Sequence, residues 1–417
     1  MKEIKAIINQ LGPIEDQEMF FAPFMVLTGG SGLGKSYTAL LWYYFLYTFS
    51  PSKLGEFINN RLPKGRKRTY PIEFSFKFSD LRRWLNNGTS RYIGYLLGNN
   101  DFSCDVNFTI DIDDDEVYYI KSKPSDEEKL IEVSINGSSR YFPLGFNDPL
   151  FTISFVASSF FMERLFDKHF IMPLLLPPAR AAFIGGNPTR PSVGMYLEFL
   201  NQLSYLKASD PINNADDQFF KSMITKLADG DIIMRDGESF LKLDNVDNPI
   251  PISSAASSVK ELAPLFYLLQ NHSSLDRFSI VFEEPEAHVH PTKQYAVMDI
   301  IARCLNKGMF IQMTSHSDYL LTRMNQLIRL GRIRKKDPKL FEEYCDKFKH
   351  NRNLFIDPDI VNGYYFKRNE ETKKVEIQKL NTASGIDFLT FNDIVKKQMA
   401  LDIQIDDYLS KAGLESN

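Results

Sequence analysis

Hydrophobic and polar positions along the chain predict an α/β fold. Nearly continuous apolar runs at Phe24–Thr28, Phe278–Phe282 and Phe310–Met313 are typical of parallel strands covered on both faces. The first of these runs leads through a glycine-rich turn into a long apolar helix that ends near Phe49, and two more strands at 2–9 and 18–24 precede it around a Gly-Pro turn. We therefore expect a mixed sheet flanked by helices.

The pattern then divides the chain into four segments. From residue 72 strict alternation replaces the apolar runs, which indicates strands with one buried face. Residues 51–147 are accordingly interpreted as an inserted α+β segment, with a polar hairpin turn at the acidic run 111–116. The expected boundaries are 1–50 for the first strands and the glycine-rich turn, 51–147 for the insertion, 148–250 for a helical second lobe with a hairpin at Asp236-Gly237, and 251–417 for the rest of the core.

Composition narrows the class of protein. With 417 residues, 43% of them hydrophobic, the chain can bury a large core, and its net charge of −4 argues against a protein that coats nucleic acid generally. The three cysteines are too widely spaced for a disulfide framework or a zinc cluster. No secretion signal begins the chain and its apolar runs fall short of a bilayer span. We expect a cytoplasmic protein without a membrane partner.

The glycine-rich turn predicts a phosphate-binding loop. Gly29, Gly34, Lys35 and Ser36 fit the pattern G-x-x-x-x-G-K-[ST], between a strand and a helix as that motif requires. Backbone N–H groups of the turn and the helix N-terminus would hold phosphates, Lys35 would reach the β/γ-phosphates, and Ser36 would bind Mg²⁺. An ordinary glycine turn between a core strand and a core helix is the alternative. The expected nucleotide contacts are Gly29, Gly30, Ser31, Gly32, Leu33, Gly34, Lys35, Ser36 and Tyr37.

Two further strand ends carry candidate catalytic groups. Glu283 and Glu284 directly follow the run 278–282, and ligands of open α/β sheets bind at the carboxyl ends of strands. The first acid would hold Mg²⁺ and the second would orient and deprotonate water. His316 follows the run 310–313 and would sense the γ-phosphate by hydrogen bonding. The alternatives are a strand that ends in polar residues and a structural histidine.

The order of these motifs resembles a known family. Gly29–Ser36, the run Val281–Pro291 (VFEEPEAHVHP) and Thr314–Ser317 together resemble ABC-type ATPases of the OLD and SMC-like branch, and EEPEAHVHP is similar to the OLD-type heads of bacterial anti-phage systems such as Septu and PARIS. The resemblance implies an ABC-type P-loop head that binds ATP and Mg²⁺. It makes Glu283 the Walker B acid, in place of the more usual aspartate, Glu284 the catalytic base and His316 the switch histidine.

The same resemblance implies a self-associating head. Such heads carry a signature segment that contacts the γ-phosphate bound by the opposite subunit. Residues 252–262 hold that position, without the expected glycine pair, and Ser257 is the residue chosen for the contact. Serine hydroxyls and N–H groups at a helix start suit the task. A serine-capped core helix is the alternative. The implied partner is a second copy, in a homodimer or a larger oligomer.

Other polar groups permit more than one interpretation. Arg180 follows the break at Pro177-Pro178 and is expected either to face a phosphate or a partner subunit or to lie on the surface. The histidines at 288 and 290 lack a third ligand for zinc. The basic runs 64–68 and 329–336 are interpreted as solvated surface, with contacts to DNA as the alternative.

Residues after His316 are too few for the Toprim nuclease domain of OLD nucleases and lack its carboxylates. They indicate two helices, a hairpin at 362–380 and a final helix. We therefore expect an ATPase head whose nucleotide-driven closure controls a protein effector, a nuclease or toxin encoded nearby, in anti-phage defence. Two alternatives stay open, namely a DNA-repair or chromosome-associated ATPase and a nucleotide-gated scaffold that sequesters a toxic partner with little turnover.

Overall fold

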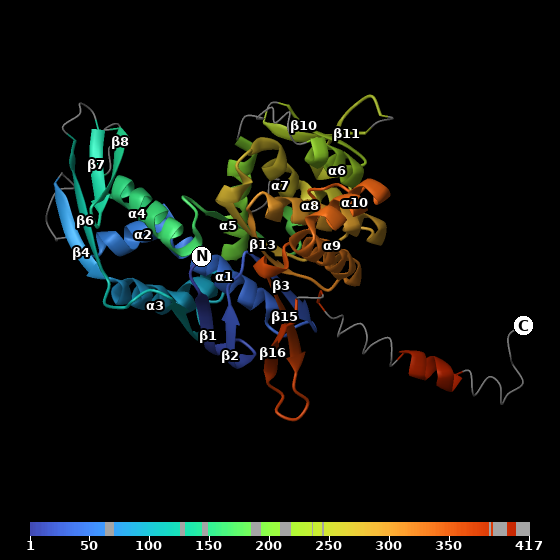
Figure 1. Ribbon diagram of the computed structural model, residues 1–417, viewed down its shortest axis with the longest axis horizontal. Coiled ribbons are helices and arrows are strands. Elements are labelled where there is room, and N and C mark those ends of the chain that lie inside the picture. Colours follow the sequence, from blue (N-terminus) through green and yellow to red (C-terminus); the bar gives the residue numbers. More distant parts are fainter. Residues whose placement is uncertain are drawn as a thin grey trace, which may run out of the picture.

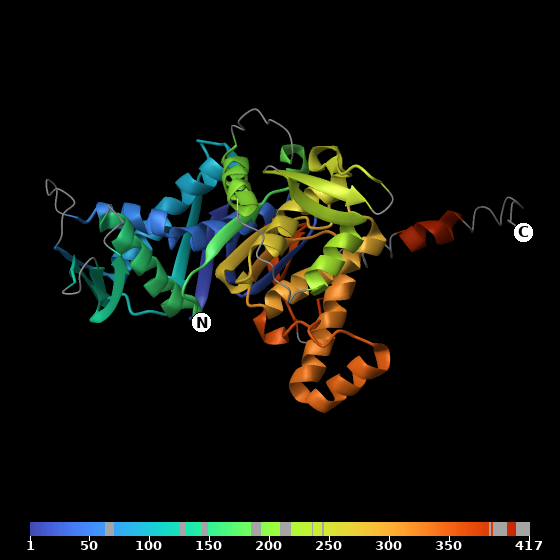
Figure 2. The same cartoon turned by 90° about the horizontal axis from the view of Figure 1, so that it is seen from above.

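A computed structural model describes residues 1–62, 71–125, 130–143, 149–184, 193–208, 218–235, 237–243, 246–382, 385–386 and 398–405. The chain folds around a large central sheet (Figure 1). A smaller lobe that contains β4 and β6 to β8 lies on one side of this sheet, and a lobe that contains β10 and β11 lies on the other. In the view from above, the helical pair α9 and α10 projects away from the body (Figure 2).

Within the described residues, the central sheet has nine strands in the order β5-β1-β2-β16-β15-β3-β14-β13-β9. From β15 to the edge strand β9 the strands β15, β3, β14, β13 and β9 are parallel, whereas β1 pairs antiparallel with β2 and β5, and β16 antiparallel with β15. The predicted α/β class, with a mixed sheet flanked by helices, is confirmed. The strands are β1 Ile4–Leu11, β2 Ile14–Phe20, β3 Phe24–Gly29, β5 Cys104–Ile110, β9 Met172–Leu176, β13 Phe278–Glu283, β14 Phe310–Thr314, β15 Val361–Arg368 and β16 Val375–Leu380.

Helices cover both faces of this sheet because successive residues of each strand point to opposite sides. In β3, Phe24 and Val26 face one hydrophobic core, and Met25 and Leu27 face the other. The helices are α1 Lys35–Thr48, α2 Pro51–Asn59, α3 Phe78–Leu97, α4 Pro149–Phe166, α5 Gly194–Ala208, α6 Gln218–Ala228, α7 Ser257–Asn271, α8 Pro291–Asn306, α9 Asp318–Lys336 and α10 Pro338–Phe348, with short 3₁₀ turns η1 Arg180–Phe183, η2 Ile252–Ser254, η3 Leu275–Arg277 and η4 Pro358–Ile360.

Helix α1 is buried nearly all round. Eleven of its residues are buried, from Lys35 to Thr48, because the sheet covers one side and helix α3 the other. The hydroxyl of Tyr44 donates to the backbone carbonyl of Leu85 in α3 over 2.6 Å. A helix that is apolar on every side needs such double cover. The insertion therefore helps to hold the helix that follows the glycine-rich turn.

The described residues of segment 51–147, which the sequence predicts to be an insertion, contribute strands to two sheets. Strand β5 joins the central sheet beside β1, while β4 Ile72–Lys77, β6 Val117–Pro124, β7 Leu130–Ile135 and β8 Ser138–Pro143 form a separate antiparallel sheet. The predicted hairpin turn at 111–116 is wrong, because these residues lead from β5 in one sheet to β6 in the other. The alternation of β5 could not reveal this, since its pairing partner lies about a hundred residues earlier.

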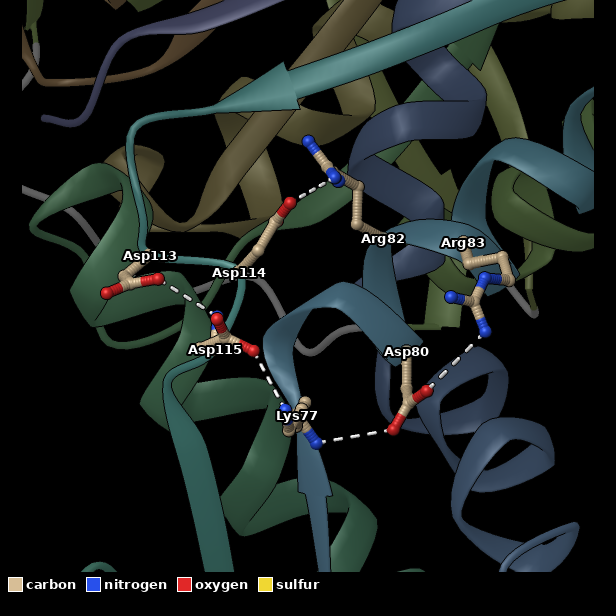
Figure 3. A network of polar contacts seen from close by, with 7 residues as sticks. All are labelled: Lys77, Asp80, Arg82, Arg83, Asp113, Asp114 and Asp115. Carbon is tan, nitrogen blue, oxygen red and sulfur yellow. Dashed lines mark hydrogen bonds and ion pairs between the residues drawn. The ribbon is translucent and has the colours of Figure 1, made fainter.

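Instead of forming a hairpin, the acidic run forms ion pairs with the start of α3 (Figure 3). Arg82 donates to Asp114, and Lys77 Nζ lies 2.8 Å from Asp115 Oδ1. We call this group the insertion network; its members are Lys77, Asp80, Arg82, Arg83, Asp113, Asp114 and Asp115. It fixes the crossover between the two sheets at the surface.

The two hairpins predicted in the second half of the chain are present among the described residues. β10 Gly230–Arg235 and β11 Glu238–Leu243 form the predicted hairpin and pair with β12 Ile250–Pro251, although Asp236 lies outside the described residues. The hairpin β15–β16 enters the central sheet beside β3. The basic run 64–68 lies outside the described residues. No helix in the described part of the chain is long and apolar enough to span a membrane.

Candidate nucleotide-binding site

The glycine-rich turn joins the carboxyl end of β3 to the N-terminus of α1. Three glycines adopt positive φ angles, Gly29 at 128°, Gly32 at 72° and Gly34 at 91°, which side chains rarely tolerate. A Cβ on Gly29 would lie 2.1 Å from the backbone oxygen of Phe366 in β15, so this position also needs glycine for close packing. The backbone therefore turns sharply at the place where the sequence predicts a phosphate cradle.

Lys35, the first residue of α1, lies folded over this turn. Its Nζ donates to the backbone oxygens of Gly29 and Gly30, over 3.2 and 2.7 Å. Burial lowers the pKa of Lys35 to about 8, although the nearby carboxylates Glu284 and Glu283 oppose the shift. A cation that is buried at the mouth of a helix N-terminus is matched to a polyphosphate, whose charge would restore its ordinary pKa.

Glu283, the last residue of β13, faces the start of α1. Burial raises the pKa of its carboxyl to about 7, and an interaction with the Ser36 hydroxyl opposes that shift. Its Oε1 atom is buried and has no hydrogen-bond partner among the described residues. An unpartnered buried carboxylate oxygen is costly, and a bound cation would satisfy it.

Glu284 leaves the strand in a strained conformation. Its φ is +46°, in a region that costs a residue with a side chain about 1 kcal/mol or more. Its N–H is directed to the backbone oxygen and to Oγ1 of Thr314 at the end of β14, each over 3.2 Å. Thr314 of the neighbouring strand thus holds the backbone of Glu284 in this conformation at the end of β13.

Glu286 is a site residue to which sequence reasoning gave no role. Its Oε1 accepts hydrogen bonds from the Ser315 hydroxyl over 3.0 Å and from the His316 N–H over 2.7 Å. Burial raises its pKa despite these hydrogen bonds, and its Oε2 has no partner among the described residues. The sequence signal was the third acid of the EEPE run, but its partners lie about thirty residues later in the chain.

His316 is exposed and follows the end of β14. Partial loss of water lowers the pKa of its ring, as does the positive charge of Lys35, while Glu284 opposes both effects. Its backbone is held on Glu286, and Ser317 caps helix α9 through its hydroxyl, which accepts from the N–H of Leu320 over 3.2 Å. The lowered pKa favours the neutral form of the His316 ring, and a fixed loop carries this side chain.

Three distant segments of the chain thus converge at one edge of the sheet. Strands β3, β14 and β13 are parallel neighbours, so their carboxyl ends deliver the glycine-rich turn, His316 and the EEPE run to the same place. Lys35 lies within electrostatic range of all three acids, and His316 within range of Lys35 and Glu284. We call Lys35, Glu283, Glu284 and Glu286 the strand-end cluster.

These residues fit a magnesium nucleotide. Mg²⁺ is held in proteins by one or two carboxylates together with substrate phosphates and water, and Glu283 with Ser36 would supply the protein ligands. Within the described residues no group of three or more His, Cys, Asp and Glu side chains is placed to hold a metal ion. His288 and His290 are exposed, and His290 instead caps helix α8 by accepting from the N–H of Thr292.

The remaining candidates occupy different surroundings. Ser257 is exposed at the first residue of α7, and the preceding Ala256 is the N-cap without a side-chain hydrogen bond. The alternative of a serine-capped core helix is therefore correct in that α7 is largely buried, and wrong in that its N-cap is an alanine. Arg180 has no exposed surface, so both predictions for it, a surface residue or one that faces a phosphate or a partner, are wrong.

No family model matches this sequence, and no curated protein matches it. Among solved structures, three SMC head domains align over most of both chains. They are an SMC head bound to the C-winged helix domain of ScpA (TM-score 0.38, 12% identity, 91% of this chain and 97% of that chain), an SMC head from Thermotoga maritima (0.33, 11%, 91% and 99%) and one from Pyrococcus furiosus with an extended coiled coil, bound to the C-terminal domain of ScpA (0.38, 11%, 97% and 100%).

Proposed function

We propose that this protein is an ABC-type ATPase that binds and hydrolyses ATP with Mg²⁺. The observation that carries the proposal is the convergence of Lys35, Glu283, Glu284 and His316 at the carboxyl edge of β3, β13 and β14. A core lysine beside buried acids of raised pKa is costly for stability alone. A bound magnesium nucleotide would compensate that cost.

Each group then has a defined task. The N–H groups of residues 29–36 and the start of α1 bind the phosphates, and Lys35 bonds the β- and γ-phosphates in place of the carbonyls of Gly29 and Gly30. Ser36 and Glu283 would hold the cation, which would neutralise charge that develops on the phosphate oxygens. Glu284 orients the attacking water and accepts its proton. His316 donates a hydrogen bond to the γ-phosphate.

The proposal extends to assembly. The exposed start of α7 at Ser257 would contact the γ-phosphate bound by a second copy of the chain, so that ATP closes a homodimer or a larger oligomer. We infer that this closure controls a protein effector, a nuclease or toxin encoded nearby, and that the system acts in anti-phage defence. The family resemblance of the EEPEAHVHP run supports this context.

Replacing Glu284 tests the mechanism. The variant Glu284→Gln keeps the size of the side chain but cannot accept a proton, so kcat should fall at least about 100-fold while ATP binding persists and the ATP-bound oligomer becomes more stable. Turnover is measured by phosphate release and assembly by light scattering. Glu370→Gln, at an exposed acid in the β15–β16 turn, is the matched control and should keep parental turnover.

Other outcomes would select another function. Parental activity in Glu284→Gln would refute the catalytic assignment. Bound nucleotide with negligible turnover in the parent would favour the nucleotide-gated scaffold. DNA binding that weakens steeply with salt would favour the DNA-repair or chromosome-associated ATPase.

A further inference from the structure

The guanidinium of Arg180 lies inside the protein, behind the strand-end cluster. Arg180 begins the short turn η1, just after the proline pair 177–178, and its side chain is completely buried. Burial lowers the pKa of Arg180 to about 10, and the negative charge of Glu261 opposes that shift. Arginine in a core usually has a partner for every N–H, so the contacts of this residue are informative.

Arg180 joins three separate segments. Its Nε donates to the backbone oxygen of Glu261 over 2.8 Å and lies 3.3 Å from the Glu261 carboxylate in helix α7. Its Nη1 donates to the backbone oxygens of Pro177 and of Glu283, over 3.0 and 2.8 Å. The guanidinium also lies 4.7 Å from the ring centre of Phe282. One side chain therefore touches α7 and the last two residues of β13.

Stability alone explains this arrangement poorly. Taking both charges of an ion pair out of water costs several kcal/mol, and apolar residues of the same volume often stabilise a protein equally well. Here the pair is also incompletely satisfied, because Nη2 of Arg180 and both carboxylate oxygens of Glu261 have no hydrogen-bond partner among the described residues. The geometry instead favours a role in which the position of one segment depends on another.

Arg180 contacts Glu261 at one end and Glu283 at the other, and both residues lie close to proposed functional positions. Glu261 comes one helical turn after Ser257, on the same face of α7. Pro264 within α7 removes the backbone hydrogen bond to the carbonyl of residue 260, which loosens the first turns from the rest of the helix. At the other end, the carbonyl of Glu283 belongs to the peptide bond that continues into Glu284. A movement of the start of α7 would reach that peptide through Arg180.

We propose that the Arg180–Glu261 pair is a positioning device that couples the exposed start of α7 to the peptide between Glu283 and Glu284. This inference rests on the proposed function. When the γ-phosphate bound by a second copy engages Ser257, the displacement of α7 shifts Glu261, and Arg180 transfers the shift to the acids of the same subunit. Each subunit therefore hydrolyses ATP efficiently only after its α7 has been engaged.

An apolar replacement of the whole pair separates this role from stability. In Arg180→Met the Glu261 charge is left buried without a partner, so this variant should unfold at a lower temperature than the parent. The double variant Arg180→Met/Glu261→Leu should regain the parental unfolding temperature. It should bind ATP and dimerise like the parent, yet its kcat should be about tenfold lower, and its rate should no longer rise with protein concentration.

Hydrogen exchange gives a readout that does not depend on turnover. This experiment is carried out in proteins that also carry Glu284→Gln. Where Arg180 and Glu261 are intact, ATP should protect the backbone amides of residues 257–261 and of residues 283–286 from exchange. In the double variant, ATP should protect only those of residues 257–261. Arg180→Lys provides a second test, because lysine keeps the charge but cannot bond the carbonyls of Glu261 and Glu283 together in the same geometry. It should show the same separation between the two peptides.

The inference would be overturned if the double variant kept kcat within about twofold of the parent and showed the same protection of residues 283–286. If the double variant fails to fold, Arg180→Lys is judged by the same two measurements. The pair would then be structural. A parent without hydrolysis or without ATP-driven assembly would instead refute the proposed function. The two failures are therefore distinguishable.

Discussion

The strand-end cluster and the insertion network are built from the same kinds of side chain but differ in their surroundings. In the strand-end cluster, burial shifts the pKa of Lys35 downward and that of Glu283 upward, and carboxylate oxygens of Glu283 and Glu286 have no hydrogen-bond partner among the described residues. In the insertion network, Lys77 and Asp115 are exposed and form an ion pair. Asp115 raises the pKa of Lys77 and Lys77 lowers the pKa of Asp115, so both shifts favour the charged forms.

This difference distinguishes a binding site from a surface contact. Exposed ion pairs gain little because water screens them and their side chains lose freedom on pairing. Buried charges that lack partners are unstable unless a ligand or a cation completes them. A charged run in a sequence therefore acquires functional meaning only when the fold removes it from water, and three experiments test that contrast.

The largest effect is expected at Glu286. Glu286→Ala removes the acceptor that holds Ser315 and the backbone of His316, so His316 should lose its fixed position. A misplacement of this size lowers kcat by about 100-fold, whereas KM for ATP should stay close to the parental value because the glycine-rich turn is untouched. Steady-state kinetics and thermal unfolding are measured together.

Glu286→Gln is the matched control for this experiment. It keeps an oxygen that accepts from the His316 N–H, so it should recover most of the lost kcat. Equal loss in both variants would show that the charge of Glu286, rather than its hold on His316, supports turnover. A kcat that is unchanged in Glu286→Ala would contradict the positioning role.

The second effect is the pH dependence of magnesium binding. The pKa of Glu283 is raised from 4.5 to about 7, and Mg²⁺ needs the ionised carboxylate, so lowering the pH from about 8 to about 6 should weaken Mg²⁺-dependent nucleotide binding about tenfold. Without ligand, the folded protein keeps a proton on Glu283 that the unfolded chain has lost, so the stability that this group contributes falls as pH rises from about 4.5 to about 7. With Mg²⁺ bound, the stability that this group contributes should instead rise with pH.

Calorimetric titration of the nucleotide at several Mg²⁺ concentrations checks this prediction. Glu283→Gln should bind Mg²⁺-nucleotide weakly at every pH and lose the dependence below pH 7. Above about pH 8, where Lys35 loses its charge in the free protein, affinity should fall again. An affinity that does not change between the two pH values in the parent would show that Glu283 is not a metal ligand.

The smallest effect is expected in the insertion network. Arg82→Ala removes an ion pair with Asp114 whose partners are 30% and 45% exposed, so the unfolding temperature should change by no more than about 3 °C and ATPase activity should stay at the parental level. High salt should reduce even this change, since it screens exposed charges. A large loss of activity with an unchanged unfolding temperature would show that the insertion takes part in catalysis and would remove the contrast.

The sequence by itself determined the local parts of this protein. The apolar runs that became β3, β13 and β14 could be recognised because a parallel strand covered on both faces needs apolar residues at every position. The glycine-rich turn could be recognised because positive φ angles at Gly29 and Gly34 demand glycine at fixed spacing. The resemblance of the motif order then linked Lys35, Glu284 and His316 before their positions were known.

Only the tertiary structure decided which side chains share a neighbourhood. The partner of Glu286 is the backbone of His316, the partner of Arg180 is Glu261, and β5 pairs with β1. Each of these contacts joins residues dozens of positions apart, and no local periodicity encodes the pairing. The acidic run 111–116 and Arg180 were misjudged for the same reason, because burial and pairing depend on the path of the whole chain and not on the residues beside them.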